Sequence, residues 1–213
     1  MSEDIEIINQ NTRIEKIKYF FKNNLKKLIV SLILILIVLI SLFGYQEYKK
    51  RLKSEIAETY NQITLKEVTT ENTNDIEQLI KIIKTKDPVY SALSLYFIIE
   101  KDLINDRKEI NSFFDLVINS QEEKEIRNLI IYKKGMYNAG MTSENELLGI
   151  LNPILKSNSV WKPHASLLMA DYFESKNNLI KSKDFLEEII NFKTTSNEIR
   201  IEAERRLKRN FSD

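Results

Sequence analysis

The residue types that most often carry chemistry in proteins are scarce in this chain. It contains one histidine, His164, four glycines and no cysteine. A thiol nucleophile, an iron–sulfur cluster and cysteine-ligated zinc are therefore excluded, and a single histidine cannot build a histidine-rich zinc site. The four scattered glycines form no loop for phosphates or a dinucleotide. We therefore expect no metal, no cofactor and no small-molecule substrate.

Two kinds of side chain could still perform acid–base chemistry. His164 lies in "VWKPHASLL" beside the expected start of a helix, and no serine or carboxylate motif accompanies it. The carboxylate pairs Glu122/Glu123 and Glu187/Glu188 lie in sequence of helical periodicity, whereas acid–base pairs need a cleft that separates their pKa values. We interpret them as a helix-start residue and solvated helix faces. The chain is not expected to be an enzyme, and an anchored hydrolase is the least favoured function.

The net charge also excludes a class of partner. The chain has 32 lysines and arginines against 31 aspartates and glutamates, a formal charge of +1. A nucleic-acid-binding protein needs a strong positive field to displace counterions from phosphates. We therefore expect no nucleic-acid partner.

The longest uncharged run predicts a membrane anchor. Residues 26–50 read "KKLIVSLILILIVLISLFGYQEYKK", and residues 28–45 carry no charge. As a helix this run is about 27 Å long, close to the roughly 30 Å hydrocarbon core of a bilayer. The bulky exit "SLFGYQ" disfavours a cleaved signal sequence, and a buried core helix would need protein on every side. We predict a transmembrane helix over residues 28–45, represented by Leu28, Ile35, Leu42 and Tyr45.

Basic flanks set the expected orientation of this anchor. Their numbers favour an inside amino terminus, with the long carboxyl-terminal part across the membrane. The basic residues are Arg13, Lys16, Lys18, Lys22, Lys26 and Lys27 before the run, and Lys49, Lys50, Arg51 and Lys53 after it.

Residues 1–27 are expected to form a basic amphipathic segment on the cytoplasmic side. Ile14, Ile17, Phe21 and Leu25 recur at helical spacing with lysines between them. Such a helix can lie on an anionic membrane leaflet. The alternative is a solvated segment that only sets the orientation.

After the anchor, the sequence indicates helices only. Residues 46–73 read as a helical extension to about Lys66, followed by the polar linker "VTTENTN". Capping signals then open successive helices: "NDIE" at Asn74, "DP" at Asp87, "SQEE" at Ser120, "SENE" at Ser143 and "TSNE" at Thr195. The expected helices after the one that opens at Asn74 span residues 88–103, 106–119, 121–138, 143–156, 160–175, 179–192 and 197–209.

These helices are expected to form an array of about three hairpins in residues 74–213, with a C-terminal capping helix. The pairs begin near Pro88, Gln121 and Val160, about the 34-residue unit of tetratricopeptide-type repeats. One hairpin cannot bury its apolar face alone, but stacked hairpins share a continuous core.

The unit "ASLLMADYFESKNNLIKSKDFLEEII" resembles a tetratricopeptide repeat (TPR). Ala170 and Ser182 stand at its small-residue positions, because small residues are needed where two helices approach closely. Phe173 stands at the large position, Asn177 and Asn178 form the turn, and Leu186 follows on the packing face. Gly140 marks the turn of the preceding unit.

The order of the parts resembles the YfgM-like family of ancillary SecYEG translocon subunits. A basic segment, an anchor ending in Gly44 and Tyr45, a helical extension, and repeats with Pro153 and Trp161 carry this resemblance. It implies a single-pass protein of the bacterial inner membrane whose repeat domain faces the periplasm and contacts the translocon and periplasmic chaperones.

Trp161 is the candidate partner contact, since tryptophan is favoured at interface hot spots, although a packing role is the alternative. A structural scaffold of an envelope or division assembly is the alternative function.

Overall fold

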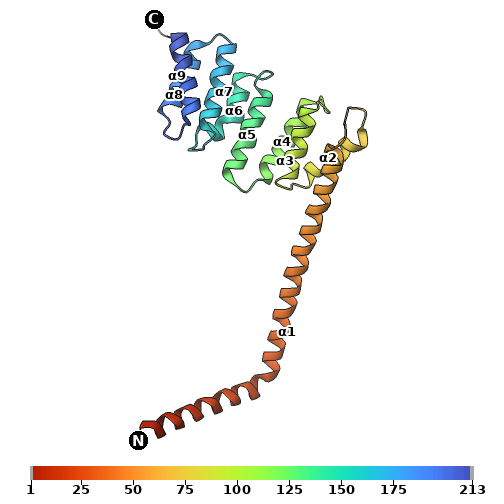
Figure 1. Cartoon of the computed structure of the whole chain (residues 1–213), viewed down its shortest axis with the longest axis vertical. Helices are drawn as coiled ribbons and strands as arrows, with labels where there is room; N and C mark the ends of the chain where they lie inside the picture. Colours follow the sequence, from red (N-terminus) through yellow and green to blue (C-terminus); the bar gives the residue numbers. More distant parts are fainter. Residues whose placement is uncertain (1, 212–213) are drawn as a thin grey trace. The chain divides into compact units, whose positions relative to one another are not determined.

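The computed structural model describes the backbone of residues 2–211 and the side chains of residues 14–16 and 18–210 (Figure 1). All regular structure in these residues is α-helical, which confirms the predicted all-α class. The side chains of Arg13 and Ile17 lie outside the described residues. The helices of residues 2–211 are α1 (Ser2–Thr64), α2 (Thr73–Lys84), α3 (Tyr90–Glu100), α4 (Arg107–Ser120), α5 (Lys124–Asn138), α6 (Glu144–Leu155), α7 (Lys162–Ser175), α8 (Leu179–Asn191) and α9 (Asn197–Phe211).

Helix α1 contains the long apolar run. Its part from Ile14 to Thr64 is long and apolar enough to cross a membrane. The chain leaves this run uncovered: Ile35, Leu42 and Tyr45 are each more than half exposed, and only Leu28 at its start is partly buried. A rod of exposed leucine and isoleucine is unfavourable in water. Helix α1 therefore has the length and the exposed apolar surface that a membrane anchor requires.

The chain divides into two compact units, Met1–Glu55 and Ile56–Asp213. The sequence predicts a repeat domain that begins at residue 74, whereas the second compact unit begins at Ile56. The reason is packing. Ile63, near the end of α1, is 1% exposed and joins the same apolar cluster as Leu79 of α2 and Phe114 of α4. The last turns of α1 therefore belong to the core of the second unit.

Three apolar clusters follow one another through the second unit. The first joins the end of α1 to α2, α3, α4 and part of α5. The second lies between α5, α6 and α7, and the third between α7, α8 and α9. Helices α2 to α9 lie side by side in chain order (Figure 1), so each cluster is shared by neighbouring helices.

Three side-chain contacts within the second compact unit join residues at similar sequence separations. The Gln121 side-chain amide donates to the Pro88 carbonyl oxygen, 33 residues away, at 2.8 Å. The Ser159 hydroxyl donates to the Glu125 carboxylate, 34 residues away, at 2.6 Å. Arg206 pairs with Asp171, 35 residues away. These three contacts therefore each join segments that lie about 34 residues apart in the chain.

The expected hairpins α5/α6 and α7/α8 each pack together extensively. The first expected pair is different, because α3 packs more extensively on α2 than on α4. Asp102 follows α3 with a φ of 50°, and the Leu103 amide donates to the Ile98 carbonyl at 3.0 Å. This left-handed residue ends α3 before the chain turns into α4.

Two of the predicted helix signals are present at the expected residues. Ser143 forms a full capping box with Glu146 at the start of α6. Asn177 adopts a left-handed φ of 57° in the α7–α8 turn, and the Asn178 side chain accepts from the Lys181 amide at 3.2 Å.

Three predicted caps are wrong. Asn74 lies inside α2, whose cap position is Asn72. Ser120 ends α4, and its hydroxyl donates to the Val117 carbonyl in place of capping α5. Thr195 is buried and donates to the Ile189 carbonyl, while Ser196 accepts from the Ile199 amide. In the last two cases the hydroxyl bonds back to the preceding helix, a local competition that the pattern alone does not resolve.

The predicted repeat residues are placed as follows. Ala170, Phe173, Ser182 and Leu186 are all buried in α7 and α8, and the Phe173 ring stacks on Phe185 with centroids 5.7 Å apart. Gly140 lies in the exposed α5–α6 turn.

Gly135 of α5 marks a close approach that can be tested. A Cβ at this position would lie 2.5 Å from Leu151 Cδ2, and Leu151 is fully buried. We expect Gly135→Ala to lower the free energy of unfolding by about 1–2 kcal/mol, because overpacking outweighs the gain in helix propensity. Urea unfolding would measure this change.

Gly149 of α6 is the matched control, since a Cβ there meets no atom within 4 Å. Gly149→Ala is expected to stabilise by about 0.5–1 kcal/mol. Equal stabilisation by both substitutions would contradict the close packing of α5 on α6.

Candidate interaction surface

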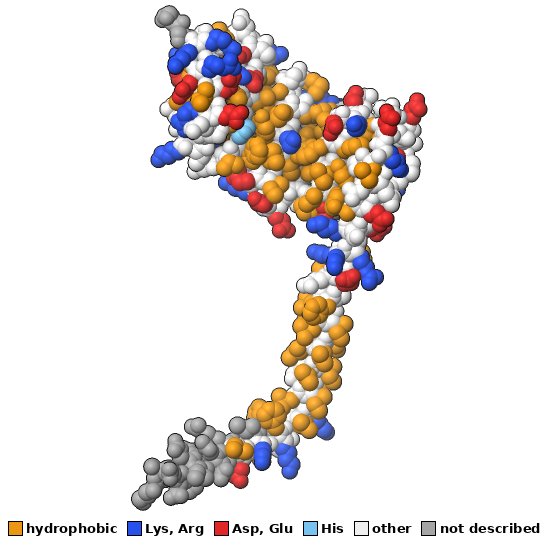
Figure 2. Space-filling view, viewed as in Figure 1, with side chains coloured by type: hydrophobic (Ala, Val, Ile, Leu, Met, Phe, Trp, Pro, Cys, Tyr) orange, Lys and Arg blue, Asp and Glu red, His pale blue; other side chains and the backbone are white. Residues whose placement is uncertain are grey.

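Helices α3, α5 and α7 place aromatic and apolar side chains on one continuous surface. On α5, Leu129, Tyr132, Lys133 and Met136 recur at positions that share one helix face. We call the aromatic surface the set Tyr96, Tyr132, Lys133, Met136, Trp161 and His164. Figure 2 shows a broad apolar region over the second compact unit, with the histidine at one edge.

Three rings join α5 to the start of α7. The Tyr132 ring stacks on Trp161 with centroids 5.9 Å apart, and the His164 ring lies 5.0 Å from Trp161. The candidate contact Trp161 is therefore a packing residue that keeps an exposed edge. Aromatic rings in such clusters are held rigidly, which lowers the entropic cost of binding a partner.

A hollow of about 440 Å³ adjoins the other end of the aromatic surface. Lys133 Nζ lies 4.7 Å from the centroid of the Tyr96 ring, and Met136 beside it is 52% exposed. The Tyr96 hydroxyl is buried without a hydrogen-bond partner among the described residues, and burial raises the pKa of Tyr96 to about 12. The remaining lining residues are Ile99, Glu100, Phe114 and Tyr137.

This arrangement is suited to apolar contact. Among the described residues no three histidine, cysteine, aspartate or glutamate side chains gather where they could hold a metal ion. His164 lies against two aromatic rings, and its Nδ1 is buried without a partner among those residues. An apolar side chain inserted beside Met136 would remove further apolar area from water.

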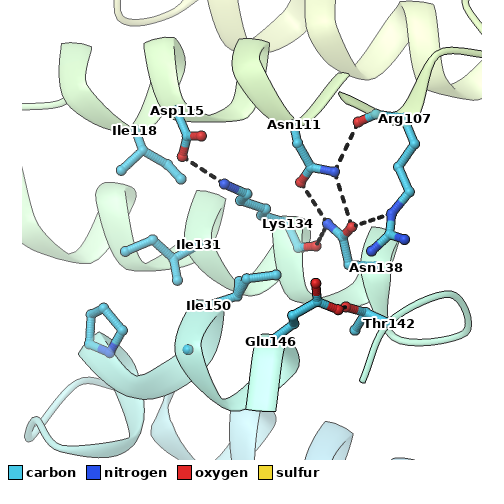
Figure 3. Close-up of a pocket in the computed structure, with 12 residues that line it drawn as sticks. Arg107, Asn111, Asp115, Ile118, Ile131, Lys134, Asn138, Thr142, Glu146 and Ile150 are labelled. Carbon is cyan, nitrogen blue, oxygen red and sulfur yellow. Dashed lines mark hydrogen bonds and ion pairs between the residues drawn. The ribbon is translucent and has the colours of Figure 1, made fainter. Parts of the chain in front are cut away.

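A second concavity, of about 520 Å³, lies between α4, α5 and α6, and both polar and apolar side chains line it (Figure 3). Asn111 and Asn138 exchange amide hydrogen bonds of 2.9 and 3.1 Å across the α4–α5 contact. Arg107 Nε donates to the Asn138 oxygen at 3.0 Å, and its Nη1 donates to the Met141 carbonyl at 2.7 Å. Asn138, at the centre of this network, is 1% exposed, whereas Arg107 and Asn111 are partly exposed.

The charged side chains that line this pocket already have partners within the chain. Lys134 donates to Asp115 at 2.6 Å. A hydrogen bond from Thr142 lowers the pKa of Glu146 below its usual range, with further contributions from Ser143 and the positive charge of Arg107. We therefore interpret the pocket as a structural network that fixes α4 on α5.

The sequence did not lead us to predict the hydrogen bonds of this network. Asn111 and Asn138 are uncharged polar residues inside helices, a pattern typical of a solvated face. Their only sequence signal is the repeated spacing: Arg107 precedes Asn111 by one helical turn, as Lys134 precedes Asn138.

No family model, curated protein or solved structure matches this chain.

The buried amide pair can be tested by truncation. Asn138→Ala leaves Asn111 and Arg107 without their shared partner, so we expect a loss of about 1–3 kcal/mol in the free energy of unfolding. Asn152→Ala, at an exposed position of α6, is the control and should change stability little. If both variants unfold at the same urea concentration, the network does not fix the helices.

His164 offers a measurement without interference, because it is the only histidine. Burial is the main cause that lowers the pKa of His164 below its ordinary value of 6.5, and the backbone of Val160 opposes this shift. The unfolded chain then binds more protons just below pH 6.5, so stability falls as the pH drops from 6.5 through the lower folded pKa. His164→Gln should remove this part of the pH dependence.

An NMR titration of the single imidazole gives the folded pKa directly. A midpoint below 6.5 agrees with a ring packed between Tyr132 and Trp161. A midpoint at or above 6.5 would contradict the described burial.

Proposed function

We propose that this chain is a membrane-anchored, TPR-like module that binds other proteins through its aromatic surface. The anchor is the uncharged part of α1, residues 28–45, with the amino terminus in the cytoplasm and the repeats on the other side. Its length and its exposed apolar side chains support the anchor. The more numerous basic residues before it support the orientation.

The repeat architecture rests on two observations. Hydrogen bonds and ion pairs join successive hairpins at separations of 33, 34 and 35 residues. Ala170 and Ser182 are fully buried where α7 and α8 pack together. Both are expected of stacked helical hairpins of about 34 residues.

The aromatic surface is the observation that carries the binding function. Alternate helices α3, α5 and α7 present it, and stacked repeats commonly bind extended or helical segments along such a face. Its partner would supply apolar side chains for the hollow beside Met136. Lys133 can meet an acidic group at the centre of the surface.

Anchoring strengthens weak contacts. A binding surface held near a membrane meets membrane-associated partners at high effective concentration, so modest affinity suffices. We propose that these partners are the Sec translocon and the exported chains or periplasmic chaperones around it, an assignment that rests on the family resemblance of the chain's parts.

Site-specific photo-crosslinking in cells tests this function. A benzophenone amino acid at Met136 should capture a translocon subunit, a periplasmic chaperone or an exporting polypeptide, identified by mass spectrometry, because Met136 is 52% exposed and lines the hollow of the aromatic surface. The same probe at Asn145, an exposed position of α6 outside the aromatic surface, is the matched control and should capture markedly less of these proteins. Equal capture at both positions, or no such partner at Met136, would refute the proposal.

A further inference from the structure

The first described part of α1, residues 14–27, separates apolar and basic side chains. At about 100° per residue, Ile14, Phe20, Phe21 and Leu25 fall within an arc of about 140°. All four are at least half exposed. The five lysines, Lys16, Lys18, Lys22, Lys26 and Lys27, occupy the remainder of the circumference.

The segment carries a net positive charge. Five lysines stand against a single glutamate, Glu15, in residues 14–27. Figure 2 shows basic side chains along one side of this part of α1 and apolar side chains along the other. A soluble partner helix could cover the apolar arc, but it would not need a dense row of lysines on the opposite side.

The segment is continuous with the apolar run. Helix α1 passes from Lys27 into residues 28–45 without a break, and Figure 1 shows α1 changing direction within its N-terminal part. A helix that lies in the membrane interface must turn in this way to enter the bilayer core. The bilayer surface beside the anchor is therefore the apolar and charged partner that the segment meets first.

We infer that residues 14–27 form an interfacial helix that binds anionic phospholipid headgroups. The inference rests on the proposed anchor. Ile14, Phe20, Phe21 and Leu25 insert among the acyl chains nearest the headgroups, and the lysines reach the phosphates, with Lys18 and Lys27 at the edges of the apolar arc. Phosphatidylglycerol-type lipids supply the negative charge that the lysines recognise.

The naturally cysteine-free chain permits a direct test with spin labels in reconstituted full-length protein. Phe21→Cys lies in the apolar arc, Asn23→Cys on the basic side, and Ile35→Cys within the apolar run. The vesicles contain phosphatidylcholine with or without phosphatidylglycerol. Collisions with oxygen report a label in lipid, and collisions with a water-soluble nickel complex report a label in water.

With phosphatidylglycerol present, the ratio of oxygen to nickel collisions should be severalfold higher at Phe21→Cys than at Asn23→Cys. Replacing the five lysines by glutamine should remove most of this difference. Replacing Lys49, Lys50, Arg51 and Lys53 by glutamine is the matched control on the other flank and should preserve it.

Each contrary outcome identifies what fails. Equal water exposure at Phe21→Cys and Asn23→Cys, with Ile35→Cys in lipid, would overturn the interfacial helix but leave the anchor. A difference that is the same without phosphatidylglycerol, and that survives the five glutamines, would overturn the binding of anionic lipid. A water-exposed label at Ile35→Cys would overturn the anchor itself.

Discussion

Removal of apolar surface from water is the constraint on which the whole molecule depends, and the chain meets it in two ways. From Ile56 onward, neighbouring helices cover one another's apolar faces, and residues such as Leu79, Leu95 and Leu151 are fully buried. In residues 28–45 the chain provides no cover, and the apolar side chains of α1 remain exposed. We propose that a lipid bilayer supplies the missing environment, because a helix satisfies its own backbone hydrogen bonds there.

Stacking of helices leaves a usable surface because consecutive hairpins bury only part of each helix. Polar and charged contacts such as Gln121 with Pro88 and Glu125 with Ser159 join one unit to the next without covering the alternate helices. The rings of Tyr96, Tyr132 and Trp161 are therefore held in place by the core below them and keep one side open. Rigid support from beneath and an accessible apolar face above are the physical requirements of a binding surface.

The sequence allowed the helices to be predicted well because the apolar periodicity is strong, and most expected boundaries lie within a few residues of the observed ones. Helix caps and turns were predicted correctly where the residue type favours a single local conformation, as for the capping box at Ser143 and the left-handed turn at Asn177. The prediction failed at Ser120 and Thr195, whose hydroxyls bond back to the preceding helix. The aromatic surface was anticipated only through Trp161, and the Asn111–Asn138 pair was missed, because both depend on which helices become neighbours.

The central claim is that the apolar part of α1 spans a membrane and separates the amino terminus from the repeats. Cysteine labelling tests it most directly, since the chain has no native cysteine. Ser175→Cys, at the exposed end of α7, and separately Ser2→Cys, would be treated in intact cells with a membrane-impermeant maleimide. We expect labelling at Ser175→Cys and protection at Ser2→Cys until the membrane is permeabilised. Labelling at Ser2→Cys with protection at Ser175→Cys would reverse the orientation, and protection or labelling of both alike would contradict a single membrane crossing between them.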